Sequence, residues 1–183
     1  MGIPSGYTSA QVVQAVPTGI NSAFVLVQAE TSFSAVMSYS ANNVFTSTYR
    51  NYRIIFNPTE GAGSITMKLR ASAVDTSTNY NGYTTYGTSS NLFANNPSGT
   101  DEWYLCDMTT AADGSGFGVI DVLNPQVAFP TTFLGQFYGA SGADNYFYTD
   151  NGRQNSTTQF DGFTITALTT AMTGTYTVYG YGK

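Results

Sequence analysis

Polar and apolar residues alternate over two neighbouring stretches of this chain. In residues 50–56 and 64–70, apolar residues occupy every second position. Side chains of a strand point to alternate faces, so each stretch predicts a strand with one buried and one solvated face. Proline and glycine breakers lie between the two stretches. We therefore expect an antiparallel hairpin over residues 49–73 that turns at residues 60–63.

Short strand-like segments separated by turn signals recur through the rest of the chain. Residues 23–29 form a nearly continuous apolar run, which predicts a strand buried on both faces. Further strands are expected at residues 34–39, 83–86, 91–94, 102–108, 117–123, 131–138, 145–148, 160–168 and 174–181. Residues 81–82 read as a turn and residues 150–155 as a loop, because they are rich in Asn, Asp and Gly.

This succession of strands predicts the fold class. No long segment has the 3.6-residue period of an amphipathic helix. The chain therefore predicts an all-β fold, an antiparallel β-sandwich that is jelly-roll-like and has about eight to ten strands.

The domain organisation follows from the length of 183 residues, which suits one compact domain. Residues 1–20 carry several Gly and Pro and predict a short N-terminal arm or linker, followed by a single β-sandwich domain over residues 21–183. Residues 12–16, with three valines, could add as a strand to a neighbouring sheet edge. The alternative is a partly ordered tail.

The composition is poor in charge. Charged residues make up 9% of the chain and the formal net charge is −5. Binding to nucleic acid needs a basic surface, so we expect no nucleic-acid partner. No run of about 18 apolar residues is present, so we expect no membrane span. Cys106, the single cysteine, lies in an apolar stretch, and we interpret it as a small buried hydrophobe rather than a reactive thiol.

The residue types present exclude most catalytic and metal-binding chemistry. With no histidine and one cysteine, the chain lacks the groups for Ser-His-Asp or Cys-His catalysis and for thiolate zinc or iron–sulfur sites. Carboxylates remain, either as a glycosidase pair or as calcium ligands in turns. The candidates are Asp101, Glu102, Asp107, Asp113, Asp121, Asp144, Asp150 and Asp161. No spaced metal or phosphate signature accompanies them, so we expect no enzyme activity, catalytic residue, cofactor or metal.

Tyrosines are concentrated in the segments expected to be loops. Tyrosine offers a large contact area with little side-chain entropy to lose, so exposed rings could stack on sugars or fill a protein interface. The candidate glycan or partner contacts are Tyr80, Tyr83, Tyr86, Tyr146 and Tyr148. The alternative is that these rings pack the ends of the sandwich.

Two segments resemble a known group of proteins. Residues 44–55, Val-Phe-Thr-Ser-Thr-Tyr-Arg-Asn-Tyr-Arg-Ile-Ile, resemble a pattern found in small β-sandwich, jelly-roll-like bacteriophage virion proteins. Residues 160–165 together with 172–181, which end in Val-Tyr-Gly-Tyr, are similar to the ending of the same domains. Such domains occur in head-decoration proteins and at tail-fibre tips, commonly as trimers. The resemblance spans roughly residues 33–183 and carries no catalytic residues.

The resemblance implies a structural function. The expected protein is a head-decoration (cement or fibre) protein, made in the cytoplasm of the bacterial host and attached to the capsid surface of the virion as a homotrimer. Its partners would be copies of itself and the major capsid protein or another virion protein. The alternative is a tail-fibre or tail-tip domain that recognises a bacterial surface glycan. The short stretch before the domain favours the decoration protein over a whole fibre.

Overall fold

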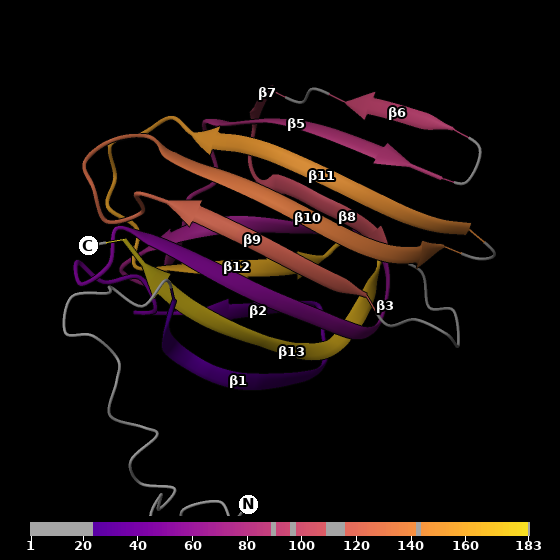
Figure 1. Cartoon of the computed structure of the whole chain (residues 1–183), viewed down its shortest axis with the longest axis horizontal. Coiled ribbons are helices and arrows are strands. Elements are labelled where there is room, and N and C mark those ends of the chain that lie inside the picture. The colour runs from indigo at the N-terminus through magenta and orange to yellow at the C-terminus, as the bar shows by residue number, and fades with distance from the viewer. Residues whose placement is uncertain (1–23, 89–90, 96–97, 109–115, 142–143, 183) are drawn as a thin grey trace, which may run out of the picture.

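The chain folds entirely from strands in the part that the structure describes. A computed structural model describes residues 24–88, 91–95, 98–108, 116–141 and 144–182, so the expected N-terminal arm lies outside the described residues. Within these ranges there are thirteen strands and no helix (Figure 1). The strands are β1 (Val25–Val36), β2 (Ser38–Ala41), β3 (Asn51–Ala71), β4 (Val74–Asp75), β5 (Tyr80–Gly87), β6 (Leu92–Asn95), β7 (Ser98–Thr100), β8 (Trp103–Met108), β9 (Phe117–Leu123), β10 (Thr131–Ser141), β11 (Asp144–Gln154), β12 (Gly162–Ala167) and β13 (Thr170–Tyr181).

The strands form two antiparallel layers. The larger sheet has the order β1-β13-β3-β9-β10-β11-β5-β6, with β7 also paired to β5. The second sheet places β12 between β2 and β3, with β8 and β4 on the other side of β3. Figure 1 shows the larger sheet in front of β2, β8 and β12. The expected antiparallel sandwich is confirmed. The two sheets differ in size, unlike the two four-stranded sheets of a jelly roll. The number of strands exceeds the expected eight to ten because short strands such as β4 and β7 are present.

The longest strand, β3, belongs to both sheets. Its first part pairs with β13 and β9 and its second part with β12 and β8. The expected hairpin turn at residues 60–63 is therefore wrong: Gly61 and Gly63, with φ of +142° and +91°, bend the strand from one sheet into the other. The alternation itself is confirmed, because the apolar positions on both sides of the bend are buried.

The core lies between the two layers and is built largely from aromatic rings. Trp103 of β8 stacks on Phe133 of β10 with ring centroids 4.3 Å apart, which joins the two sheets. The other large buried side chains include Tyr52, Tyr80, Tyr148, Phe45, Phe56, Phe137, Phe160 and Phe163. Cys106 is buried among them, as expected, and burial raises the pKa of its thiol.

The most apolar run of the chain lies at an edge of the larger sheet. Residues 23–29 were expected to be buried on both faces, but β1 pairs only with β13 and the Leu26 side chain is 55% exposed. Hydropathy alone cannot separate a central strand from an edge strand, because both can be continuously apolar. The described residues include no helix long and apolar enough to cross a membrane.

Candidate binding surface

Two of the five tyrosines expected as contacts belong to the core. Tyr80 and Tyr148 are buried, so the prediction that they meet a glycan or partner is corrected. The Tyr80 hydroxyl donates to the Thr76 carbonyl (3.0 Å) and accepts from the Leu69 amide (2.8 Å), and its ring packs edge-on against Trp103. These contacts place the Tyr80 ring inside the sandwich. They agree with the alternative interpretation, in which the tyrosine rings pack the ends of the sandwich.

Tyr86 and Tyr146 are half-buried and form a cluster at one end of the sandwich. Tyr86 stacks on Phe93 of β6, with centroids 4.9 Å apart, and on Tyr148 at 5.3 Å. Tyr146 stacks on Tyr148 at 6.1 Å. Because their faces are already covered by neighbouring rings, these two tyrosines have less surface to offer than the sequence suggested.

Tyr83 is the one member of the five that is well exposed, at 42%. Residues 81–82 were expected to form a turn, but they lie inside β5, which pairs with β11 from Tyr80 to Gly87. On this strand Tyr80 and Thr84 point inward, so Tyr83 points to the outer face of the larger sheet. Burial of the tyrosines is thus decided by alternation along β5 and β11.

Around Tyr83, three neighbouring strands present a mainly polar surface, which we call the polar patch. In the sheet register, Thr132 pairs with Arg153 and Arg153 with Asn81. The next row pairs Leu134 with Asn151 and Asn151 with Tyr83. The polar patch consists of Thr132 and Leu134 of β10, Asn151 and Arg153 of β11, and Asn81 and Tyr83 of β5. It measures roughly 10 Å by 7 Å between backbone positions.

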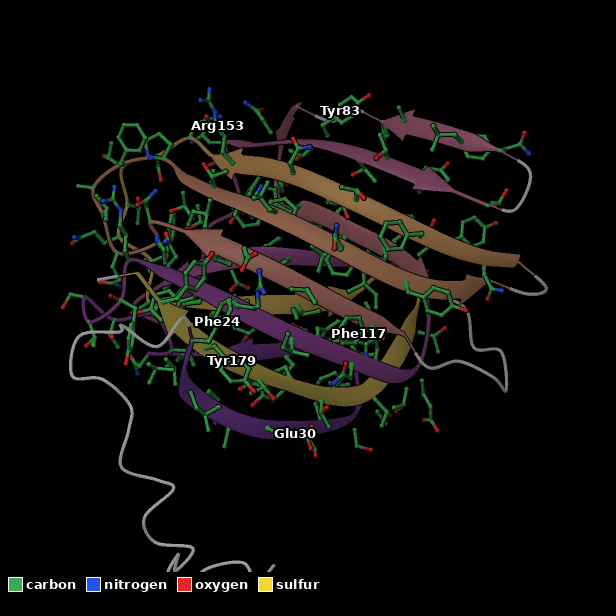
Figure 2. All side chains as sticks on the ribbon, viewed as in Figure 1. Phe24, Glu30, Tyr83, Phe117, Arg153 and Tyr179 are labelled. Carbon is green, nitrogen blue, oxygen red and sulfur yellow. The ribbon has the colours of Figure 1, made fainter. Side chains whose placement is uncertain are left out.

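The polar patch is hollowed. A depression of about 540 Å³ is lined by its six residues together with Gly82 and Gly152. An adjoining depression of about 380 Å³ shares Leu134 and Asn151 and extends to Arg53 and Asp121. Figure 2 shows Tyr83 and Arg153 at the β5–β11 end of the sheet. Residues 150–155 were expected to be a loop, so sequence reasoning missed Arg153 and Asn151.

A tight ion pair borders the polar patch. Arg53 donates two hydrogen bonds to Asp121, from Nε at 2.8 Å and Nη2 at 2.5 Å. These bonds raise the pKa of Arg53. The Phe24 ring covers the guanidinium at 4.7 Å and also packs edge-on against Tyr181. Both charges are therefore satisfied within the molecule.

Beneath the outer face lies one buried carboxyl group. Asp150 alternates with Asn151 and points inward, and neither of its side-chain oxygens has a hydrogen-bond partner among the described residues. Burial raises its pKa to about 8. The Thr84 hydroxyl, from the paired position on β5, opposes part of this rise without reaching hydrogen-bond geometry. Asp150 is therefore largely uncharged at neutral pH.

The other end of the same outer face carries a line of exposed aromatic side chains, which we call the aromatic row. Phe117 of β9 pairs with Tyr138 of β10, and Tyr138 pairs with Phe147 of β11. Their side chains are 50%, 42% and 52% exposed. Figure 2 places Phe117 at the start of β9. Leu92, on β6, continues the row beyond Gly87.

The remaining acidic candidates are spread over separate contacts. Asp107 accepts a hydrogen bond from Ser64 at 2.7 Å, and Asp161 accepts one from the Ser72 amide at 2.9 Å. Asp101 and Glu102 share a depression with Tyr104, where Glu102 lies 3.6 Å from Lys68. Asp113 and the side chain of Asp144 lie outside the described residues. No metal-binding group of three acids or cysteines forms within the described part of the chain.

Comparison with known proteins adds no relative. No family model, no curated protein and no solved structure matches this chain. A functional proposal therefore depends on the chemistry of the outer face and on the sequence resemblance.

Proposed function

We propose that this protein is a structural subunit of a bacteriophage particle, a head-decoration protein that assembles with copies of itself into a homotrimer on the capsid surface. The observation that carries the proposal is the aromatic row. The two sequence segments that resemble virion β-sandwich proteins support the same function.

The aromatic row has the character of a protein interface. Phe117, Tyr138 and Phe147 occupy adjacent strands at one level of the sheet, so their exposed surfaces adjoin. Contiguous exposed apolar surface on a soluble protein commonly marks an interaction site, and aromatic residues are enriched at such sites. Burying the three rings against another copy would remove apolar surface from water.

The sheet beneath the row suits a rigid building block. Strands β9, β10 and β11 form an uninterrupted antiparallel meander, so the three rings are held by regular backbone pairing. The side chains of the aromatic row are uncharged, so covering them with a partner would dehydrate no ionic group of the row itself. A cyclic trimer needs a defined, repeatable contact of this kind.

Sedimentation velocity of the purified full-length chain tests the assembly. We expect a trimer for the wild type and a monomer for the double variant Phe117→Ser/Phe147→Ser. The matched control is Val74→Ser, which removes an exposed apolar side chain from β4 in the second sheet and should leave the trimer intact. A wild-type protein that sediments as a monomer at all concentrations contradicts self-assembly.

Antibody labelling of purified phage particles tests the location. We expect label distributed over the head. Particles that carry no label, or that carry it only on the tail, contradict the decoration function.

A further inference from the structure

Arg153 differs from the other described cations in having no hydrogen-bond or ion-pair partner among the residues that the structure describes. Arg53 is paired with Asp121, Lys68 with Glu102, and Arg70 with Asp75. Arg50 donates to the Asn124 side chain at 2.8 Å. Arg153 makes no hydrogen bond or ion pair with any described residue, and it is exposed on the outer face. A guanidinium without a partner in the described part of a chain with so few charges is a candidate for binding a ligand.

The neighbours of Arg153 also have unused polar groups. The Tyr83 hydroxyl and the Asn151 amide have no hydrogen-bond partner in the described part of the chain. Both side chains line the 540 Å³ depression with Arg153, and Leu134 supplies an apolar wall. Residues that carry a hydroxyl, an amide, a guanidinium and one exposed ring thus border one shallow depression, and such groups can fix the orientation of a polar ligand.

The charges around the hollow permit an anion to bind. Two carboxyl groups line the adjoining depression, and none of the residues described around the 540 Å³ hollow is acidic. Of these two, Asp121 is neutralised by Arg53, and Asp150 is buried beneath the strand. Arg153 therefore has no acidic neighbour among the described residues that line the depression. Its planar guanidinium can donate two parallel hydrogen bonds to a carboxylate group.

We infer that the polar patch binds a saccharide that carries a carboxylate group, such as a uronic or sialic acid unit. Arg153 holds the carboxylate, the Tyr83 ring lies against the apolar face of a sugar ring, and the Asn151 amide bonds to hydroxyls. The inference is independent of self-assembly, because the aromatic row lies at the opposite end of the strands.

The backbone around the polar patch favours a saccharide over an acidic peptide. Extended peptides usually bind by adding a strand to a free sheet edge, where main-chain groups are unpaired. In the polar patch β10 and β11 are paired on both sides, and the outer side of β5 is paired with β7 at Tyr80 and Asn81 and with β6 from Thr84 to Gly87. A ligand here must be recognised through side chains, which suits the hydroxyls and carboxylate of a sugar.

Isothermal titration calorimetry of the full-length chain tests the inference. The probes are oligosaccharides of galacturonate, glucuronate and N-acetylneuraminate, with the neutral galactose oligosaccharide and a tetraglutamate peptide as comparisons. We expect saturable binding of at least one acidic saccharide. We also expect Arg153→Gln to weaken that binding by roughly tenfold or more, because a charge-assisted hydrogen bond pair is lost.

Matched variants separate the site from general charge effects. Arg50→Gln removes the same charge outside the patch and should leave binding unchanged. Tyr83→Phe should weaken binding only modestly, since it removes one hydroxyl, and Tyr83→Ala should lose binding, since the ring supplies the stacking surface. Absence of binding to all three acidic saccharides overturns the inference. So does equal binding of the galactose oligosaccharide or the peptide, or an Arg153→Gln variant that binds like the wild type.

Discussion

The two faces of the larger sheet use the same residue types for opposite purposes. On β10, Phe133 and Phe137 point into the sandwich and are buried, whereas Leu134 and Tyr138 point outward and are exposed. All four side chains are large and mainly hydrocarbon; what separates the buried pair from the exposed pair is their parity along the strand. The aromatic residues of this chain therefore serve both the core and the surface, and their register along the strand decides which.

The difference between the inner and outer faces should separate effects on folding stability from effects on association. Inner residues touch other buried groups on several sides, so their removal leaves a cavity. Outer residues lose little on truncation in the isolated chain, because water already reaches them. Substitutions on the inner face should therefore change the free energy of unfolding, and substitutions on the outer face should change association.

Phe137→Ala on the inner face should have the largest effect. The Phe137 ring fills the space left by two glycines, since a Cβ on Gly118 or Gly135 would come within 2.5 or 2.6 Å of it. We expect the free energy of unfolding to fall by roughly 3–5 kcal/mol, as for other buried Phe→Ala changes. Urea denaturation measures this loss, and a loss below about 1 kcal/mol would show that the inner face is not close-packed here.

Asp150→Asn should change how the stability of the inner face depends on pH, because it removes the buried carboxyl group. The buried carboxyl has its pKa raised from 3.8 to about 8, so between these values the folded state holds one more proton than the unfolded state. Stability contributed by the protonated form is complete below about pH 4 and is lost as the pH rises toward 8. The wild type should therefore lose about 1.4 kcal/mol per pH unit relative to the variant within this window.

Denaturation of both proteins across the same pH series measures that difference. Other titrating groups are common to both proteins and largely cancel. A stability difference that does not change with pH would mean that Asp150 is solvated or paired in the folded state, which contradicts its place on the inner face.

Alternation made much of this fold predictable. The all-β class, the buried positions on both halves of β3 and the burial of Cys106 follow from local pattern and composition. Each depends only on residues close in sequence, where side-chain parity is fixed by the strand. The strand before and after Gly61 was therefore recognised, although its partners were not.

The partners of each strand could not be predicted, because they depend on distant residues. Glycines near residue 62 are compatible with both a hairpin and a bend, and only the pairing of β3 with four other strands selects the bend. Likewise Asn and Gly in residues 150–155 favoured a loop, although this segment ends β11. A signal for Arg153 was present: Asn151 and Arg153 alternate with the inward-pointing Asp150 and Gln154.

Phe147→Ala on the outer face should have the smallest effect on the isolated chain. We expect the free energy of unfolding at low protein concentration to change by no more than about 0.5 kcal/mol, because the side chain is already half exposed. At high protein concentration the wild type should gain stability by assembling. Only folded chains can join the assembly, so association shifts the equilibrium away from the unfolded state. The variant should not gain it, because it lacks one of the three exposed rings of the aromatic row.

Thermal unfolding over a wide range of protein concentrations measures this contrast. The wild-type midpoint should rise with concentration while that of Phe147→Ala stays constant, and Val74→Ser should follow the wild type. If the wild-type midpoint is also constant, the aromatic row is exposed without being an interface, and the division between a stabilising inner face and an associating outer face fails. If instead Phe147→Ala loses stability at every concentration, the row belongs to the fold rather than to assembly, because only a contact within one chain is independent of concentration.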